Sequence, residues 1–526
     1  MKDKRKVKEI VKAIATQKKR VANNLSKKIE KKEHLFSILI PLFAGVLFFV
    51  FSIINLTSSI WFDESYSAYL IRGDFGQIWE MTAQDVHPPF FYFALKMWSS
   101  IFGTSDIALR FMSVFFGLIA IVFIFHAVKK WFGIRAAGLA TIFAAISPMF
   151  IRYGQEMRMY TMVLAIVAIA TYVLSLALEK GTDKKGRKFW ALYAIIIAIG
   201  MWTHYFSAFM WIAHVALIVY HFGGFKKIFK DKKLVRTLLF TYGFAVLLYL
   251  PWIPAFFNQV KTVQSGFWIP PVSFNSMADF FTSVLFFNKA QEVTGWGFVF
   301  GTALIAIFSL ALIKIFKKTN VKTKKKLISS LILVAVPFAV MTILSLPPLT
   351  SSFVDRYILY SIVALWALFG IVIILSKVDW IKNVLTALVV IVAAYGICFV
   401  EHREPRGYVK DILAETFVVA EECEPIIANG VWTYYDGIFY STEKRPIYLF
   451  DEDVDYIYGS LEPIRMLRAN LIDNKSEFLK DKKTVWYILD TPTNGADYEI
   501  PDWAKEMRII SEISLDHHTA LRFSAE

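Results

Sequence analysis

Two groups of polar residues near the amino terminus could do chemistry. Asp63-Glu64 is a pair of carboxylates that follows an apolar segment and Trp61-Phe62. Asp85-Val86-His87-Pro88-Pro89 holds an acid and an imidazole beside two prolines that restrict the backbone. A carboxylate can take a proton from a hydroxyl group or bind a metal ion. The alternatives are structural: Asp63-Glu64 could open a helix, where acidic residues are favoured, and Asp85 could be an N-cap.

Polar and aromatic residues occur together at three later points, in each case next to an apolar segment. These points are Arg152-Tyr153-Gly154-Gln155-Glu156-Met157-Arg158-Met159-Tyr160, Thr203-His204-Tyr205 and Asp355-Arg356-Tyr357. Guanidinium groups suit paired hydrogen bonds to phosphate or carboxylate. If a helix begins near Met149, Arg152 and Glu156 lie one turn apart, so an ordinary intrahelical ion pair is the alternative.

The composition indicates the class of protein that carries these groups. The chain has 526 residues, of which 56% are hydrophobic and 19% charged, whereas soluble domains average about 25% charged. The sequence therefore predicts an α-helical, polytopic membrane protein. Two cysteines exclude a disulfide framework, and no surface of interleaved basic and aromatic residues indicates a nucleic-acid partner.

Eleven segments are apolar enough to cross a bilayer, which needs about 20 residues per helix. They are predicted near 36–56, 109–128, 136–151, 159–178, 189–203, 206–222, 237–256, 296–316, 327–345, 357–376 and 384–400. The first 35 residues hold 13 Lys and Arg, and every second loop is basic, which places the amino terminus in the cytoplasm. The first outer loop is then 57–108, and all the polar groups described above lie on the outer side.

Three regions follow from this pattern. Residues 1–35 form a basic cytoplasmic segment, either an amphipathic helix on the inner leaflet or a plain topology anchor. Residues 36–400 form the transmembrane domain, and the first 400 residues together hold 44 basic and 18 acidic residues. Residues 401–526 hold 14 basic and 25 acidic residues, and their apolar runs alternate with helix-like stretches before a hairpin at 508–514 and 520–524. We expect a small extracytoplasmic α/β domain there.

The ordered set of Asp63-Glu64, Asp85-x-His87-Pro88-Pro89, Arg152…Glu156-x-Arg158-x-Tyr160 and Asp355-Arg356-Tyr357 resembles membrane glycosyltransferases of the GT-C class. The match is to the superfamily of protein O-mannosyltransferases and lipid A aminoarabinose transferases. Val86-His87 stands where the aminoarabinose enzymes have Glu-Lys, and Phe90-Phe91-Tyr92 where eukaryotic mannosyltransferases have Leu-Gly-Lys. The resemblance therefore points to the class and leaves the sugar open.

The resemblance implies a role for each matching residue. Asp63 would activate the acceptor hydroxyl, with Glu64 and Asp85 assisting, and His87 would orient the loop or contact the donor. Arg152, Arg158 and Arg356 would hold the donor phosphate, and Glu156, Tyr160 and Tyr357 would line the substrate site. A divalent metal ion is a possible cofactor, with Asp85 and His204 as its ligands.

The function expected from this resemblance is inverting transfer of a sugar from a polyprenyl-phosphate donor. The acceptor would be a lipid, polymer or protein of the cell envelope, at the outer face of the membrane. A multi-span transporter or lipid flippase is the alternative, although such proteins usually hold their charged groups near the bilayer midplane.

Overall fold

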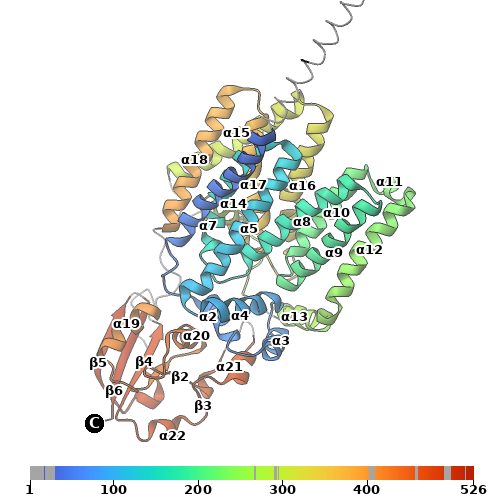
Figure 1. The fold of residues 1–526 in the computed structure, drawn as a ribbon. Coiled ribbons are helices and arrows are strands. Elements are labelled where there is room, and N and C mark those ends of the chain that lie inside the picture. Colours follow the sequence, from blue (N-terminus) through green and yellow to red (C-terminus); the bar gives the residue numbers. More distant parts are fainter. Residues whose placement is uncertain are drawn as a thin grey trace, which may run out of the picture.

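The structure is a computed structural model, and it describes residues 17, 30–265, 268–288, 293, 295–401, 409–455, 460–490, 499–515 and 517–525. Most of these residues form one helical bundle, and a smaller unit with a β-sheet lies at one end of it (Figure 1). Residues 1–16 and 18–29, for which the sequence leaves an amphipathic helix and a topology anchor open, lie outside the described residues.

Eight helical segments within the described residues are long and apolar enough to cross a membrane. They are Glu30–Ile53, α5 (Asp106–Phe132), α8 (Tyr160–Lys180), α12 (Lys232–Tyr249) with η1 (Leu250–Trp252) and α13 (Ile253–Ser265), α15 (Trp296–Lys318), α16 (Val321–Leu344), η2 (Asp355–Ile358) with α17 (Leu359–Leu375), and α18 (Asp379–Glu401). The chain is a multi-pass membrane protein.

Three further helical segments complete the correspondence with the eleven predicted ones. The helices α6 (Ile134–Ala145) and α7 (Pro148–Gly154) are bent by 60° relative to each other. Taken together as one broken helix, they form a ninth candidate span. The helices α9 (Lys184–Thr203) and α10 (Ser207–Phe222) cover the predicted fifth and sixth segments. Every predicted segment therefore contains a helix, but eight of them, or nine with the bent pair, are long and apolar enough to cross a membrane in the part of the chain that the structure describes.

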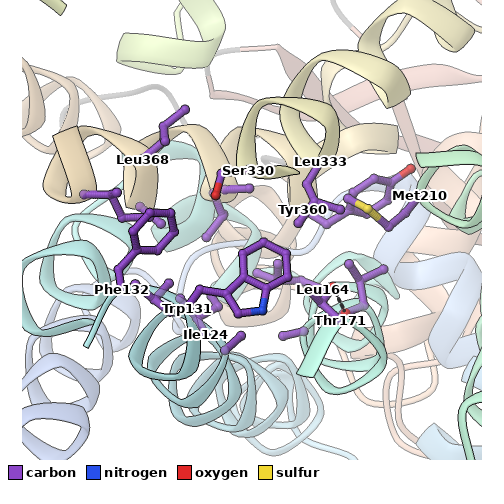
Figure 2. Close-up of a pocket in the computed structure, with 18 residues that line it drawn as sticks. Ile124, Trp131, Phe132, Leu164, Thr171, Met210, Ser330, Leu333, Tyr360 and Leu368 are labelled. Carbon is purple, nitrogen blue, oxygen red and sulfur yellow. Dashed lines mark hydrogen bonds between the residues drawn. The ribbon is translucent and has the colours of Figure 1, made fainter. Parts of the chain in front are cut away.

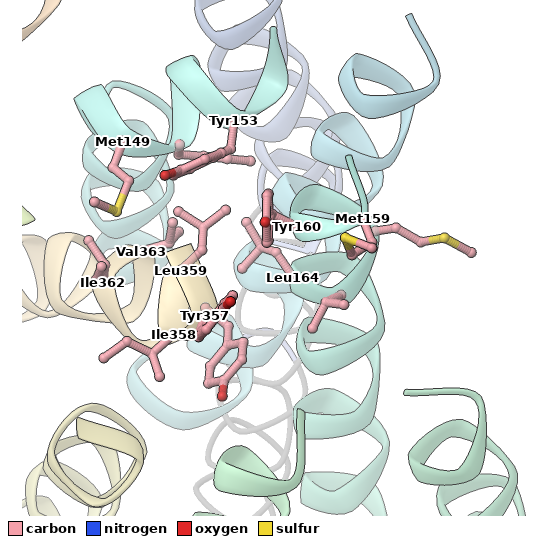
Figure 3. Packing of buried hydrophobic residues seen from close by; sticks show 14 of the residues in the cluster. Met149, Tyr153, Met159, Tyr160, Leu164, Tyr357, Ile358, Leu359, Ile362 and Val363 are labelled. Carbon is pink, nitrogen blue, oxygen red and sulfur yellow. The ribbon is translucent and has the colours of Figure 1, made fainter. Parts of the chain in front are cut away.

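The bend between α6 and α7 shapes the end of the bundle that lies toward the carboxyl-terminal unit. Pro148 occupies the first position of α7, where its missing N–H costs nothing, and the same proline cannot continue α6. The short α7 then ends at Gly154, and residues 155–159 reach α8 without helical structure. Met149 and Tyr153 of α7 pack with Leu359 and Val363 of α17 in a buried cluster (Figure 3). This packing holds the α7–α8 connection at that end.

Four short helices lie across the same end of the bundle. They are α2 (Phe62–Leu70), α3 (Phe75–Gln84), α4 (Phe90–Phe102) and α13, close to the sheet-containing unit (Figure 1). Asp74 caps α3 in a reciprocal arrangement with Gln77. Asp85 ends α3, and Pro89 begins α4. The turn that carries Asp85 and His87 is thus fixed by a helix end on each side. The remaining helices of the bundle are α11 (Phe225–Lys230) and α14 (Phe274–Phe286).

The carboxyl-terminal unit is built on one six-stranded sheet of order β3-β2-β1-β4-β6-β5. Its strands are β1 (Ile426–Ala428), β2 (Ile447–Phe450), β3 (Leu471–Ile472), β4 (Thr484–Asp490), β5 (Arg508–Leu515) and β6 (His518–Ser524). The first four pair in parallel, and β6 runs antiparallel to both β4 and β5. Its helices are α19 (Val409–Val419), α20 (Val431–Tyr440), α21 (Glu462–Leu467) and α22 (Lys475–Leu479), with the short η3 (Asp451–Asp453) and η4 (Asp502–Ala504). The α/β character and the final hairpin agree with the sequence prediction.

Candidate active site

A cavity lies where one end of the helical bundle meets the carboxyl-terminal unit. Acidic, basic and aromatic side chains line it together. They are Trp61, Phe62, Asp63, Tyr66, Asp85, Val86, His87, Arg158, Tyr160, Trp268, Arg356, Tyr357 and Trp432. Seven of the eleven residues predicted for the site from sequence are in this set: Asp63, Asp85, His87, Arg158, Tyr160, Arg356 and Tyr357. We call this space the polar cavity.

Asp63 is the second residue of α2 and presents its carboxylate to the polar cavity. Its side chain is 24% exposed, whereas that of Arg158 is only 3% exposed. Arg158 donates from Nη1 to the Asp63 backbone carbonyl (2.9 Å) and to Ser67 Oγ (3.0 Å), and its Nε lies 3.9 Å from Asp63 Oδ2. The guanidinium therefore fixes the first turn of α2 and lies beside the one carboxylate of that turn that solvent can reach.

Glu64, the neighbour of Asp63 in the sequence, points the other way. It is 1% exposed and accepts from Arg110 Nε (2.8 Å) and Nη2 (2.6 Å), and from the backbone N–H of Met157 (2.8 Å). Arg110 also donates to the backbone carbonyls of Leu56, Ser58 and Ser59. Because Glu64 does not line the polar cavity, we revise its predicted catalytic role: this carboxylate positions α2 against α5 and the α7–α8 connection.

Arg152 and Glu156 also lie outside the lining of the polar cavity. Arg152 Nε is 3.4 Å from Glu156 Oε1, and Glu156 is 1% exposed. Because α7 ends at Gly154, the two residues pair across the end of a helix and not within one. This ion pair is therefore not the intrahelical one that the sequence offered as the alternative, and the substrate-binding roles of Arg152 and Glu156 stay predictions.

Arg356 brings a second guanidinium to the polar cavity from a distant part of the chain. It lies in η2, just before α17, and its Cζ is 5.3 Å from the Trp268 ring centroid, 5.8 Å from that of Tyr357 and 6.0 Å from that of Tyr160. Aromatic faces attract a guanidinium while leaving its N–H groups able to donate. The group is thus held in place near Arg158, and among the described residues no carboxylate forms an ion pair with it.

Asp85, His87 and His204 form a row at one side of the polar cavity. His87 Nδ1 lies 3.6 Å from Asp85 Oδ2, and the rings of His87 and His204 are 5.8 Å apart. Burial and the neighbouring His87 lower the pKa of His204 well below its ordinary value, which favours the neutral imidazole. His204 itself lines an adjoining cavity and not the polar one.

The predicted metal ligands can be tested against this geometry. Within the ranges that the structure describes, no three His, Cys, Asp or Glu side chains are grouped so as to hold a metal ion. Asp85 and His204 offer two donors, fewer than the three protein ligands of a typical catalytic zinc site. The residues present therefore do not complete a metal site.

Two other cavities adjoin the polar cavity. An apolar cavity of about 1270 Å³ shares Val86, His87 and Tyr357 with it and is lined further by residues such as Phe209 and Val260. A third cavity shares Trp268 and Arg356 and contains Asp279 and Asp355. The polar cavity therefore connects a space suited to a hydrocarbon chain with a space suited to a polar molecule.

A separate cavity lies deeper in the bundle between α5, α8, α16 and α17 (Figure 2). Trp131, Phe132, Leu333 and Tyr360 are among the side chains that line it, and the described residues around it include no ionisable group apart from Tyr360. Such a surface can hold an acyl chain but cannot supply a general base or a phosphate contact.

Six lining residues were not predicted for the site from sequence, and two of them come from segments far from any of its motifs. Trp268 follows α13, and Trp432 belongs to α20 of the carboxyl-terminal unit. Neither lies near a polar motif in the sequence, so no local pattern marked them out. Only packing of remote segments brings these rings to the cavity.

Comparison with known proteins agrees with this architecture. A family model described as dolichyl-phosphate-mannose-protein mannosyltransferase matches residues 86–254. The fold is similar to that of ArnT from Cupriavidus metallidurans in the apo state, with 13% identity, a TM-score of 0.58, and coverage of 93% of this chain and 98% of that one. None of the curated proteins compared with the sequence matches it.

The same ArnT has also been solved bound to undecaprenyl phosphate. That structure is 14% identical to this chain, with a TM-score of 0.58, and the match covers 92% of this chain and 97% of the other. The likeness is one of fold along nearly the whole length. The family model matches less than half of the chain, so the comparisons show a fold shared with ArnT and a partial match to the mannosyltransferase family.

The ion pair of Glu64 and Arg110 gives a first prediction. Glu64→Gln leaves the buried guanidinium without its counter-charge, and removal of one partner of a buried pair costs about 3–5 kcal/mol. We expect a lower melting temperature of the purified protein in detergent, measured by intrinsic fluorescence. Glu80→Gln, at an exposed position of α3, is the matched control and should melt like the wild type. Equal melting of both variants would contradict the positioning role.

Proposed function

We propose that this protein transfers a sugar from a polyprenyl-phosphate carrier to a hydroxyl group of a cell-envelope acceptor. The acceptor is a lipid, a polymer or a protein, and the reaction takes place at the outer face of the membrane with inversion at the anomeric carbon. Asp63 is the proposed general base. The observation that carries this proposal is a single cavity in which the Asp63 carboxylate lies with the guanidinium groups of Arg158 and Arg356.

The two guanidinium groups support a phosphate-linked donor. A phosphate ester that leaves as an anion needs positive charge and N–H donors already in position. Arg356 is surrounded by aromatic rings, and Arg158 donates its Nη1 hydrogen bonds to α2. A phosphate between them would complete the charge balance of the cavity, with His87 as a further contact at its edge.

The neighbouring apolar cavity supports an isoprenoid carrier. It shares His87 and Tyr357 with the polar cavity, so a phosphate bound by the arginines can extend its hydrocarbon tail directly into it. Burial of such a tail contributes about 25 cal/mol per Å² of apolar surface. The structure of ArnT with undecaprenyl phosphate shows that a protein of this fold binds such a carrier.

The chemistry follows from these positions. Asp63 accepts the proton of the acceptor hydroxyl, whose oxygen forms a bond to the anomeric carbon on the face opposite the phosphate. The bond from that carbon to the phosphate oxygen breaks, and its electron pair leaves with the polyprenyl phosphate, which Arg158 and Arg356 stabilise. Asp85 lies in the same cavity and can bind a sugar hydroxyl. Since attack and departure occur on opposite faces, the product is inverted.

A transporter or flippase is less well supported by the same geometry. Transporters usually bind their substrates near the bilayer midplane, between broken helices of two related halves. Here the ionisable groups of the polar cavity lie at helix ends: Asp63 begins α2, and Arg356 precedes α17. A catalytic site at the membrane surface accounts for this placement.

The proposed orientation has the amino terminus in the cytoplasm and the carboxyl-terminal unit outside. Cys423 of that unit is exposed and free, and in a Cys398→Ala background it is the only thiol of the chain. We expect a membrane-impermeant maleimide to label Cys423 in intact cells. The control is the cysteine-free protein with Lys184→Cys, in an exposed position of the opposite loops, which should react only after lysis. The reverse pattern would overturn the orientation.

The substitution Asp63→Asn tests whether Asp63 is the general base. The amide cannot accept the proton, and loss of a general base lowers rates by about 10² to 10⁴. Transfer is measured with purified protein in nanodiscs, using a radiolabelled polyprenyl-phosphate sugar and a membrane extract as the acceptor source. Glu80→Gln is the matched control, because it removes an exposed carboxylate outside the cavity. Activity of Asp63→Asn close to that of the wild type would remove Asp63 as the base.

Arg356→Ala tests the phosphate contact. Loss of a charged hydrogen-bond donor should raise the KM for the lipid-linked donor by about tenfold, because each 1.4 kcal/mol is a factor of ten. The KM for the acceptor should change much less. Arg135→Ala, exposed at the start of α6, serves as the control for loss of one positive charge. Equal increases in the two KM values would count against a phosphate role.

A further inference from the structure

The carboxyl-terminal unit contacts α2, the helix that carries Asp63, through one face of α20. Tyr440 accepts a hydrogen bond from the backbone N–H of Ile60 (2.9 Å), and Arg72 donates to the carbonyl of Ile438 (2.8 Å). Ser65 donates to the carboxyl group of Asp436. These bonds lie at both ends and in the middle of α2, so α20 is docked along its whole length.

The side chains in the interior of this contact are buried. Asp436 is 8% exposed, and burial raises its pKa well above the ordinary value, which favours its uncharged form. Tyr435 packs its ring against those of Tyr66 (5.5 Å between centroids) and Tyr69 (5.0 Å). A contact of buried aromatic rings and hydrogen-bonded polar groups holds two elements in one arrangement. The position of α20 relative to Asp63 is therefore set by the fold.

Trp432 lies on the first turn of this docked helix and differs from its neighbours. It is 47% exposed, and its ring centroid is 4.1 Å from that of Phe62. Among the described residues that line the polar cavity, it is the one that comes from the carboxyl-terminal unit. Its ring extends the wall of the cavity beside Asp63.

The cavity has two aromatic sides with different surroundings. Trp268 lies 5.3 Å from the Arg356 guanidinium and so belongs with the groups proposed for the phosphate. Trp432 packs on Phe62, next to the proposed base. The molecule that loses its proton to Asp63 is the acceptor, so the ring of Trp432 stands on the acceptor side.

We propose that Trp432 is the platform on which a sugar ring of the acceptor stacks, and that the acceptor is therefore a carbohydrate-bearing molecule. This inference rests on the proposed function and names the acceptor class. The C–H face of a pyranose packs on an aromatic ring, while its hydroxyl groups point to its rim and reach hydrogen-bond acceptors such as Asp63 and Asp85. One hydroxyl of the stacked ring is then the nucleophile.

Two other readings of Trp432 fit less well. An interfacial belt residue faces lipid headgroups, whereas Trp432 lines the polar cavity and packs on Phe62. A peptide acceptor is commonly bound through its backbone at a strand edge. All the described lining residues of the polar cavity belong to helices or to the turns between them, so they offer no strand edge.

Binding measurements separate the acceptor role from the rest of the mechanism. The full-length protein in nanodiscs is applied to an array of gluco-, galacto- and manno-configured oligosaccharides and, in parallel, to serine- and threonine-containing peptides. Affinity for undecaprenyl phosphate is measured in the same samples. The variants are Trp432→Ala, Trp432→Phe and the matched control Trp296→Ala, which removes a tryptophan that is 73% exposed and outside the cavity lining.

We expect the wild type to bind oligosaccharides and Trp432→Ala to bind them about tenfold more weakly, with unchanged affinity for undecaprenyl phosphate. Trp432→Phe should retain most of the affinity, and Trp296→Ala should match the wild type. Peptide binding in place of sugar binding, no sugar binding at all, or unchanged sugar binding by Trp432→Ala would each overturn the inference. Failure of the wild type to bind undecaprenyl phosphate would instead count against the proposed function.

Discussion

The ion pair between Glu64 and Arg110 is the interaction on which the candidate site depends. Its carboxylate and guanidinium are almost fully buried, and the pair links α2 to α5 while the N–H of Met157 ties in the α7–α8 connection. A buried ion pair of this kind is costly to break, because each charge alone would lack both water and a partner. The pair fixes the rotation of α2, and this rotation turns Asp63 toward the polar cavity.

The charged residues in this region are of two kinds: some form ion pairs with each other, and others line the polar cavity. Glu64 and Arg110 neutralise each other in the core, as do Arg152 and Glu156 at the end of α7. Arg158 and Arg356 instead line the polar cavity, and the surroundings of Arg356 are aromatic rings. The cavity therefore offers positive charge close to the carboxylates of Asp63 and Asp85. This combination suits a reaction in which an anion leaves and a hydroxyl loses a proton.

The carboxyl-terminal unit takes part in the same arrangement. The contact of α20 with α2 joins residues more than 360 positions apart in the sequence. Its hydrogen bonds and stacked rings hold α2 from the side opposite to the bundle, so α2 is fixed between two bodies.

The sequence by itself determined the membrane character, the eleven apolar segments and the α/β nature of the last 125 residues or so. These features depend on local composition and periodicity, because a bilayer demands about 20 apolar residues wherever a helix crosses it. It also identified Asp63, Asp85, Arg158 and Arg356, since polar groups beside apolar segments are conspicuous.

Tertiary structure alone decided which of two neighbouring carboxylates faces the cavity. Asp63 and Glu64 are adjacent on a helix, where successive side chains point about 100° apart, and only the position of Arg110 shows which of them is buried. It likewise brought Trp268 and Trp432 to the cavity from segments without any polar motif. Contacts between remote segments depend on how complete helices pack, and no local pattern of residues encodes that packing.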